Sequence, residues 1–527
     1  MTSDEQMYCT GGYQLSKGLM IYRDFPYVTQ LPYHPLLCAA LYKITGTTHY
    51  LLTARLISVV FDVIIIICIF SIIRKIFAEY FYSGITAGLT GAALFVFNPF
   101  SSYLCGLAWN HDMVLLCIVL AFRIFLGIST SSFRVESCGS KTESRNRKIR
   151  NSCLKDFSTA PQRGFGRNDR NSLASVEMTA NNKICMFAIA SLLTIAAWTR
   201  ATSVFVMPVF FAIIIYSAWA KAHPTFTSLF AMASGVIVFS IIPIWIIVES
   251  GRAFFINIFT MSMLHGQLLH QLHLAYDKGY LTITALRNRE FLFLILTAVF
   301  SWFAVFGLRK RIQFTQKTNT LLALLVLAAM IGIAYFPPTM WKQYFGIPVA
   351  FLIIIEAYAI FYLRKMENKI PFKTAICIFT VLAMATAAGQ KPITKISKIL
   401  EVKNYTPIKV HNISKSIVAK TDSQLILTLS PLYAIEGGGE IYTELSAGVS
   451  AFRVADKLSQ TDREICHVIG LREIPQITAD RPAGAIVIGP ELTRFDKIDL
   501  KSIVPSDWQR VNCKDASVHA FFPRKQP

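Results

Sequence analysis

Long apolar stretches recur along the chain, and polar turns or longer polar segments separate them. Each stretch is long enough, or nearly so, to cross a hydrocarbon core of about 30 Å as a helix. The pattern predicts ten membrane-spanning helices, over residues 51–73, 84–104, 111–128, 184–199, 203–217, 226–248, 290–308, 319–336, 344–363 and 374–389. The fourth and fifth stretches are short and nearly contiguous, so a single broken helix is an alternative to two crossings.

Basic residues decide between these alternatives, because Lys and Arg concentrate on the cytoplasmic side of membranes. The basic clusters share one side only if residues 184–217 cross the membrane twice. This topology places residues 1–50, 249–289 and 390–527 on the outer face. The clusters are at 74–75, 133–183, 221, 309–311 and 364–365.

The polar segments differ in character. Residues 1–50 form a first outer loop, in which 36–44 predict a short interfacial helix. Residues 129–182 carry ten Lys and Arg against five Asp and Glu, with few large apolar residues, which predicts a flexible cytoplasmic loop within the membrane domain 51–389. Residues 390–527 predict a small α/β domain, with strands at 424–432 and 484–489 and a helix at 446–458. The predicted fold class is a mainly α polytopic membrane protein with this domain at its end.

Composition agrees with a membrane protein. The 527 residues are 54% hydrophobic and only 16% charged, against about 25% charged in soluble domains. The net charge of +21 comes from clusters between apolar runs, which reflects topology and argues against a nucleic-acid partner. Among the eleven cysteines, Cys466 and Cys513 share the polar C-terminal region, and they form the one plausible disulfide.

The first outer loop gathers groups suited to sugar transfer. Such a reaction needs a carboxylate that accepts the hydroxyl proton of the acceptor, cations that hold a departing phosphate, and aromatic surfaces for the sugar. Adjacent acids at a chain start are more often merely solvated. The candidate residues here are Asp4, Glu5, Tyr8, Tyr22, Tyr33 and His34.

Three later outer positions add candidates. Asp112 begins the third span, where a carboxylate is costly unless it is paired or used, although a helix cap would explain it as well. Arg200, between the two short spans, suits an anionic headgroup, but it would also suit ordinary phospholipid. Lys342 and Tyr344 follow a proline turn and resemble an interfacial anchor too.

Two further groups of residues suggest a metal site and an ion pair. On a helix, His270, His273 and Asp277 would share one face, as metal ligands need, and they are weak candidates for a divalent metal. Arg55 and Asp62 are seven residues apart in the first span, which predicts an intramembrane pair.

Several motifs, taken in order, resemble the GT-C superfamily of glycosyltransferases. Within this superfamily, the sequence resembles the glycosyltransferase family 39-like branch. That branch contains the protein O-mannosyltransferases and the bacterial lipid A aminoarabinose transferase. The likeness spans about residues 3–390. The motifs are Asp4-Glu5-x-x-Tyr8, Tyr22-Arg23-Asp24, Tyr33-His34-Pro35-Leu36, Asn98-Pro99 before Asp112, Trp198-Thr199-Arg200 before Pro208, and Lys342-x-Tyr344-x-x-x-Pro348.

The resemblance implies a GT-C-like bundle and an inverting transfer from a polyprenyl-phosphate sugar, with no cofactor required. It implies that Asp4 is the general base, with Glu5 beside it and Asp112 as the second-loop acid. Arg200, Lys342 and Tyr344 would bind the donor phosphate, with His34 at a position that holds Lys in the aminoarabinose transferase. Tyr8, Tyr22 and Tyr33 would line the substrate site.

The acceptor would be a glycolipid, a glycan or a protein hydroxyl. The bacterial inner membrane, with the site facing the periplasm, is the expected location; the sequons at Asn404 and Asn412 leave a eukaryotic lumen open. Family members place a membrane helix before the acidic pair, so the resemblance implies that this helix is missing here.

Other function classes remain as alternatives. An O-antigen ligase or polymerase also acts on lipid-linked sugars. A transporter would need charged or broken helices at mid-membrane and usually a repeat, whereas the ionisable residues here gather at the outer ends. A catalytically inactive membrane assembly protein is the third alternative.

Overall fold

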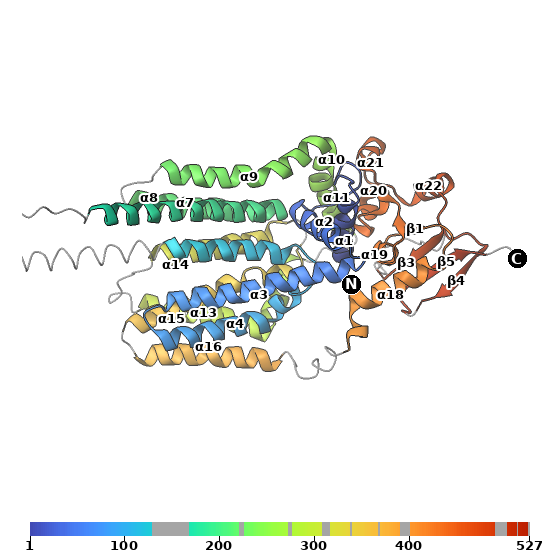
Figure 1. Ribbon diagram of the computed structural model, residues 1–527. Helices are drawn as coiled ribbons and strands as arrows, with labels where there is room; N and C mark the ends of the chain where they lie inside the picture. The colour runs from blue at the N-terminus through green and yellow to red at the C-terminus, as the bar shows by residue number, and fades with distance from the viewer. Residues whose placement is uncertain are drawn as a thin grey trace, which may run out of the picture.

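The structure is a computed structural model. It describes residues 1–128, 168–220, 226–271, 277–307, 317–337, 340–366, 369–389, 401–490, 503–513 and 515–524. A bundle of long, roughly parallel helices forms one part of the molecule and a small sheet domain the other (Figure 1). Short helices from the first 50 residues and from 252–271 lie between the two parts.

Among the described residues, eight helices are long and apolar enough to cross a membrane. The other two predicted spans form shorter apolar helices, Phe81–Phe97 and Ala201–Tyr216. The predicted mainly α membrane fold is therefore confirmed. The eight are Tyr50–Ile76 (α3), His111–Ile128, Asn182–Thr199 in α7 (Asn168–Thr199), Thr227–Ser250 in α9 (Phe226–Ser250), Arg289–Gly307 (α13), Lys317–Tyr335 (α14), Lys342–Lys365 with α15 (Val349–Lys365), and Pro371–Gly389 in α16 (Lys369–Gly389).

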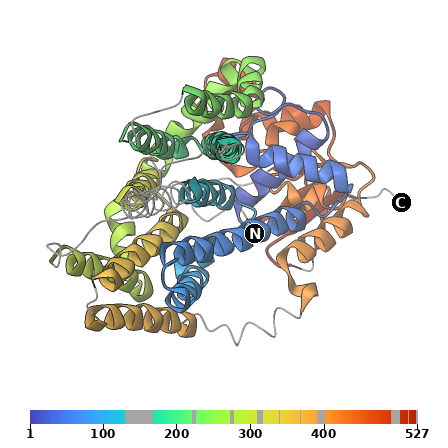
Figure 2. The ribbon, with the colours of Figure 1, turned by 60° about the vertical axis from the view of Figure 1, so that its left-hand side comes forward.

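The two short predicted spans are separate helices and not one broken helix. α7 ends at Thr199, Arg200 is extended with φ −147° and ψ 117°, and the 3₁₀ turn η1 (Ala201–Phe205) leads into α8 (Val206–Ala220). α8 then runs back along the bundle (Figure 2). α7 already begins at Asn168, inside the segment predicted as a flexible loop, and residues 129–167 of that segment lie outside the described residues.

Glycines allow close packing inside the bundle. A Cβ atom on Gly91 of α4 (Phe81–Phe97) would lie 2.3 Å from Cδ1 of Ile73, and one on Gly88 would lie 2.8 Å from the ring of Phe70, both on α3. α4 and α3 therefore approach more closely than larger residues would permit. α15 forms the centre of the bundle, because nearly all of its residues are buried.

The C-terminal domain is built on a five-stranded mixed sheet with the order β2-β1-β3-β5-β4. β1 pairs in parallel with β2 and β3, whereas β5 pairs antiparallel with β3 and β4. The predicted strands and helix correspond to β1, β3 and α20. The strands are β1 (Leu425–Thr428), β2 (Glu440–Ile441), β3 (Ala485–Ile488), β4 (Trp508–Asn512) and β5 (His519–Pro523), and the helices are α18 (Thr406–Val418), α19 (Leu432–Ile435), α20 (Val449–Ala455), α21 (Gln460–Cys466) and α22 (Ile474–Asp480).

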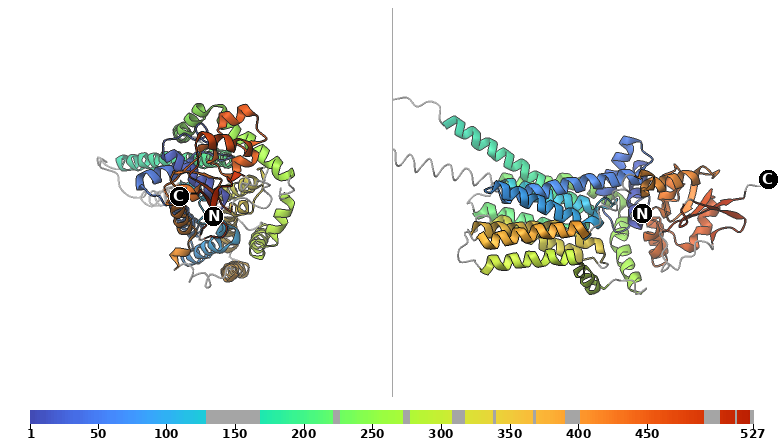
Figure 3. Two further views of the ribbon diagram at one scale, coloured as in Figure 1. Left: turned by 90° about the vertical axis from the view of Figure 1, so that its right-hand side faces the viewer. Right: turned by 90° about the horizontal axis from the view of Figure 1, so that it is seen from below.

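Two short helices from the start of the chain, α1 (Ser3–Ser16) and α2 (Tyr33–Thr45), lie between the bundle and the C-terminal domain (Figure 3). α1 begins with a capping box, in which Thr2 and Glu5 bond each other's backbone. Although α1 is polar, Glu5 to Gln14 are buried on all sides. Gly11 and Gly12 permit this, since a Cβ atom there would lie 2.6 Å from Tyr27 Cε2 and 2.7 Å from Cys38 Cβ.

The remaining short elements connect these parts at the same end of the bundle. They are α5 (Pro99–Leu104), α10 (Arg252–Phe255), the π-helical turn η2 (Ile256–Thr260), α11 (Met261–Gln271), α12 (Lys278–Leu286), and the 3₁₀ turns η4 (Lys342–Gly346), η5 (Val402–Asn404), η6 (Thr443–Leu445) and η7 (Leu471–Glu473).

Two predicted pairs are wrong. Cys466 and Cys513 are both free thiols: Cys466 ends α21 and packs against Ala253 of α10, whereas Cys513 follows β4 at the edge of the sheet. Arg55 does not pair with Asp62, because two helical turns separate them by about 10 Å along the axis and α1 offers a nearer carboxylate. Asp62 instead accepts from the Gly106 amide at 2.9 Å.

Candidate active site

The end of the bundle that bears the C-terminal domain gathers side chains from distant parts of the sequence. Asp4 comes from the first turn of α1, and Arg200 from the extended residue before η1. Tyr344 lies in η4, and Arg453 lies on α20 of the C-terminal domain. The charges of both arginines act on the carboxyl group of Asp4.

Asp4 has an unusual carboxyl group. Burial raises its pKa from 3.8 to about 6, and the neighbouring negative charge of Glu5 adds to the rise. Arg200 and Arg453 act in the opposite direction and lower the pKa. The carboxyl is therefore mostly ionised at pH 7, yet it is a stronger base than an ordinary aspartate.

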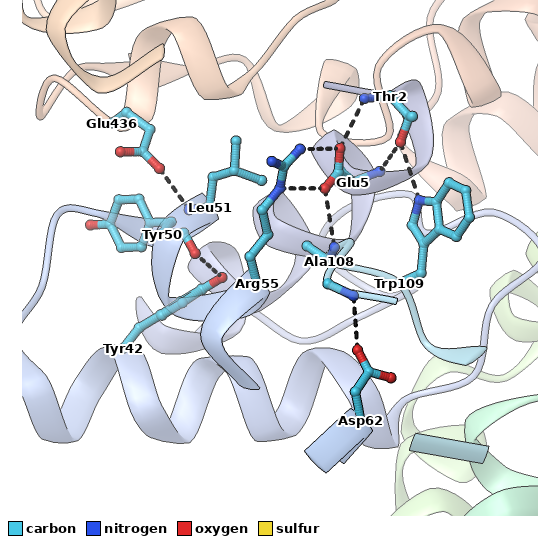
Figure 4. A network of polar contacts seen from close by, with 11 residues as sticks. Thr2, Glu5, Tyr42, Tyr50, Leu51, Arg55, Asp62, Ala108, Trp109 and Glu436 are labelled. Atoms are coloured by element: carbon cyan, nitrogen blue, oxygen red, sulfur yellow. Dashed lines mark hydrogen bonds and ion pairs between the residues drawn. The ribbon is translucent and has the colours of Figure 1, made fainter. Parts of the chain in front are cut away.

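Glu5 has a different environment although it is the next residue. Its side chain is fully buried, and its two oxygens accept from Arg55 Nε at 2.8 Å, Arg55 Nη2 at 3.0 Å, the Ala108 amide at 3.1 Å and the Thr2 amide at 3.0 Å (Figure 4). Burial alone would raise the pKa of Glu5, but the Arg55 bonds and charge, with these amides, hold it below its usual value. All four lone-pair positions of the carboxylate are used, so Glu5 fixes α1 against α3.

Arg200 is held on three sides. Its Nε lies 3.2 Å from the Thr202 hydroxyl, and Nη1 donates to Nδ1 of His111. The guanidinium also lies over the ring of Tyr344, 4.3 Å from its centroid. With only 9% of Arg200 exposed, these contacts fix the position of a positive charge close to Asp4.

Aromatic groups form the wall beside Asp4. Tyr8 is 3% exposed, lies one turn after Asp4 on α1, and contacts the His34 ring edge to face at 5.1 Å between centroids. The Asp4 charge also reaches the Tyr103 hydroxyl. Burial lowers the pKa of His34 to about 4, so this residue is neutral at pH 7 and is no substitute for a lysine charge.

The other predicted site residues are less closely associated. Asp112 is buried beside Asp62 and Ser58, and its neighbour His111 is the residue that contacts Arg200. Lys342 is exposed. The Tyr22 hydroxyl donates to the Gln30 carbonyl and the Tyr33 hydroxyl to the Phe239 carbonyl, both at 2.5 Å, so each is used within the protein.

The structure describes two of the three weak metal candidates, His270 and Asp277. α11 ends at Gln271, just after His270, and Asp277 caps the next helix by accepting from the Gly279 amide at 2.9 Å. His273 lies outside the described residues. His270 and Asp277 thus belong to different described elements, and the metal site predicted from them and His273 stays a prediction.

Sequence reasoning missed His111, Tyr103 and Arg453. His111 stands beside Asp112 in the sequence, so its position at the mouth of the same helix was available as a signal. Arg453 belongs to a short helix some 250 residues after Arg200, in a domain with no chemical motif of its own. Only the docking of that domain onto α1 brings Arg453 to Asp4.

Comparisons with known proteins give no match by sequence and a clear match by fold. No family model matches the chain, and no curated protein matches it. The crystal structure of ArnT from Cupriavidus metallidurans bound to undecaprenyl phosphate is 11% identical, with a TM-score of 0.56 over 98% of this chain and 93% of that one. The apo structure of ArnT is 12% identical, with a TM-score of 0.53 and the same coverage.

A third structure is similar at a lower level. The oligosaccharyltransferase AglB from Archaeoglobus fulgidus, in complex with an inhibitory peptide and a dolichol-phosphate, is 12% identical, with a TM-score of 0.41 over 93% of this chain and 66% of that one. The fold comparison therefore rests on ArnT, the lipid A aminoarabinose transferase, whose fold is of the GT-C superfamily. The predicted GT-C fold is confirmed, and at this identity the likeness concerns the fold alone.

Proposed function

We propose that the chain is a membrane glycosyltransferase that moves a sugar from a polyprenyl-phosphate donor to a hydroxyl group of an acceptor. The observation that carries the proposal is that a carboxyl group of raised pKa, Asp4, and a buried arginine, Arg200, whose charge acts on that carboxyl, lie at one end of the bundle. The reaction requires one group of each kind. A fold shared with a protein crystallised with undecaprenyl phosphate supports the same donor class.

In this mechanism Asp4 takes the proton of the acceptor hydroxyl. The hydroxyl oxygen forms a bond to the anomeric carbon while the bond from that carbon to the phosphate oxygen breaks. The lipid phosphate leaves with the electron pair of the broken bond, and attack from the opposite face inverts the anomeric centre. Arg200, held by His111 and Tyr344, stabilises the negative charge that develops on the phosphate.

The other residues have supporting roles in this proposal. Glu5 positions α1, and Asp112, buried beside Ser58, fixes the start of the helix that carries His111. Tyr8 provides an aromatic surface next to Asp4, and the exposed Lys342 lies in the same turn as Tyr344, where it can contact the donor headgroup. Tyr22, Tyr33 and His34 shape the surrounding wall.

The site faces the outer side of the membrane in this proposal. α3 ends with Arg74 and Lys75, and α15 ends with Arg364 and Lys365. These ends of the helices lie away from the C-terminal domain (Figure 1). Since basic residues favour the cytoplasmic side, the opposite end, with Asp4, belongs to the periplasm or a lumen. The bacterial inner membrane is the membrane that we propose.

The proposal is tested by changing Asp4→Asn in protein reconstituted into liposomes with undecaprenyl-phosphate-linked sugars. Acceptors are a lipid A glycolipid and serine-containing peptides, and the measured product is released undecaprenyl phosphate. We expect the transfer rate to fall by roughly 100-fold or more, while the binding of undecaprenyl phosphate stays unchanged.

The matched control is Asp24→Asn. Asp24 lies in the same outer segment but pairs with Arg23 at 2.8 Å. The transfer rate of Asp24→Asn should therefore stay within about twofold of that of the unchanged protein. Transfer by Asp4→Asn at the original rate would remove Asp4 as the base. Failure of the unchanged protein to use any polyprenyl-phosphate sugar would remove the proposed activity itself.

A further inference from the structure

Three metal-ligating side chains meet at the joint between the bundle and the C-terminal domain, away from the Asp4 site. His49 immediately precedes α3, His411 lies on α18, and Glu436 follows α19. One potential ligand atom of each lies within 4.8 Å of those of the other two. His411 and Glu436 are buried, with 3% and 1% of their surface exposed.

Glu436 is held from one side and directed to the other. Its Oε1 accepts from the Leu51 amide at 2.7 Å, in the first turn of α3, as Figure 4 shows. Its Oε2 lies 3.0 Å from Nδ1 of His411. Backbone bonding of one oxygen therefore orients the second oxygen toward the imidazoles, which is how outer contacts orient metal ligands.

The two imidazoles lie next to each other. Their rings stack with centroids 3.6 Å apart and planes at 25°, so one ring has to turn before both can direct a nitrogen lone pair at a single ion, which must lie in the plane of each ring. His411 also hydrogen-bonds the backbone of Thr48, a contact that fixes the tautomer of ligating histidines. Nδ1 of His49 is buried and has no hydrogen-bond partner among the residues that the structure describes. Such an atom is costly unless something else occupies its lone pair.

The separation of two of the three ligand atoms is close to that in a tetrahedral site. Ligands at about 2.0 to 2.2 Å from Zn²⁺ lie about 3.4 Å from one another. The 3.0 Å between Nδ1 of His411 and Oε2 of Glu436 is close to that value. Two imidazoles with one carboxylate form a donor set that suits Zn²⁺ and leaves one position for water.

We propose that His49, His411 and Glu436 bind one divalent transition-metal ion of the Zn²⁺ class, with water as the fourth ligand. The ion links the start of the first described spanning helix, α3, to two elements of the C-terminal domain, α18 and α19. It therefore stabilises the docked position of that domain. This role is independent of the sugar transfer proposed above.

A simpler account is a hydrogen-bonded cluster without a metal. That account explains the contact between His411 and Glu436, since an imidazole N–H would donate to the carboxylate. It leaves the buried Nδ1 of His49 without a partner in the described structure. The two accounts differ in whether the protein binds metal at a fixed stoichiometry.

The test uses the full chain in detergent, stripped with EDTA and then dialysed against Zn²⁺. Bound metal is measured by mass spectrometry, and Co²⁺ is substituted to record the intense visible bands of a tetrahedral ion. We expect about one ion per chain and a higher temperature of unfolding with Zn²⁺ than with EDTA.

The variants are His411→Ala and Glu436→Gln, with His270→Ala as the matched control. Glutamine retains an oxygen for the Leu51 amide but removes the anionic ligand, so Glu436→Gln should fold and lose the metal. His270 is an exposed histidine on α11, and its variant should keep the metal. A stripped wild-type chain that takes up no stoichiometric Zn²⁺ overturns the proposal, as does metal that His411→Ala and Glu436→Gln both retain.

Discussion

Asp4 and Glu5 are adjacent acids with opposite environments. Asp4 has positive groups at a distance and a raised pKa, whereas Glu5 has four direct hydrogen-bond donors and a lowered pKa. An acceptor hydroxyl can approach only a carboxylate with lone pairs to offer. Of these two adjacent acids, Asp4 therefore fits the role of a base and Glu5 that of a support.

The pH dependence of transfer should report the pKa of Asp4. A base acts only when it is deprotonated, so the rate is full well above pH 6 and falls as the pH drops through about 6. The initial rate of release of undecaprenyl phosphate, measured from pH 5 to 8, checks this. A rate that is flat down to pH 5 would contradict it.

Changing Arg453→Gln should move that profile. Because the Arg453 charge lowers the pKa of Asp4, its removal raises the pKa, and the variant loses more of its rate at pH 6 than at pH 8. Lys457→Gln, on the same stretch of the C-terminal domain but bonded to Gln271, is the control and should leave the profile in place. An unshifted profile in Arg453→Gln would separate Arg453 from the site.

Arg200→Gln should weaken binding of the donor. A charge-assisted hydrogen bond to a buried group contributes roughly 1.5 to 3 kcal/mol, so the KM for the donor should rise about 10- to 150-fold. Arg252→Gln is the control, because Arg252 is an exposed arginine paired with Asp462 at the same end of the molecule. An unchanged donor KM in Arg200→Gln would contradict a phosphate-binding role.

At this scale the sequence predicted Asp4, Tyr8, Arg200 and Tyr344, since their spacings within separate motifs resemble a known family. Two features of the site were missed for different reasons. The charge of Arg453 matters only after a domain docks, which no local pattern encodes. The resemblance placed Glu5 beside Asp4 in an acidic pair, and its bond to Arg55 was missed because Arg55 lies 50 residues away, in a helix where Asp62 seemed its partner.

α1 is an element that its own sequence does not explain. A polar, glycine-containing helix of 14 residues would be marginal alone. It is stable here because its neighbours satisfy it: Arg55 and Ala108 bind Glu5, the Leu432 amide binds Gln6, and Gln14 bonds Ser446. The position of Asp4 therefore depends on contacts made by the rest of α1.

Breaking the contact between Glu5 and Arg55 should mainly lower the free energy of unfolding, and should change the transfer rate less. Glu5→Gln leaves the largely buried Arg55 without a counter-charge, which should reduce the free energy of unfolding by about 3 kcal/mol. Thermal unfolding in detergent measures it, and the rate per folded molecule should fall much less than in Asp4→Asn. The control is Glu79→Gln, because Glu79 is an exposed acid that lies 4.0 Å from Lys365. Its free energy of unfolding should stay within about 0.5 kcal/mol of that of the unchanged protein.

The spanning helices were predictable because each is a continuous apolar run of membrane length. β4 and β5 were not, because a strand with one exposed face lacks such a run: β5 alternates between buried and more exposed residues. The helix over 168–182 was also missed. Its residues are polar and charged, which indicates solvent but does not exclude a helix.

The whole molecule is held together at the C-terminal domain. That domain contacts α1 through Gln6 and Gln14, α3 through Glu436, and α10 through Cys466. Most of these contacts are buried, so the C-terminal domain should stay docked on the bundle when the chain between the two is cut.

A protease site inserted between residues 390 and 400 tests this docking. After cleavage in detergent, we expect a tag on the C-terminal fragment to retain the bundle fragment. Gln6→Leu, which leaves the buried Leu432 amide without its acceptor, should weaken the retention, whereas Arg252→Gln, with an exposed ion pair, should not. Separation of the unmodified fragments on cleavage would contradict a tight joint.

The long sequence separation between Asp4 and Arg453 has a consequence for biosynthesis. About 450 residues must leave the ribosome after Asp4 before Arg453 exists, which takes roughly 20 to 90 s at 5 to 20 residues per second. During that time α1 has neither its Leu432 nor its Ser446 partner. A nascent chain thus inserts its helices first and completes the site last, so a premature stop within the C-terminal domain should leave an inserted bundle without activity.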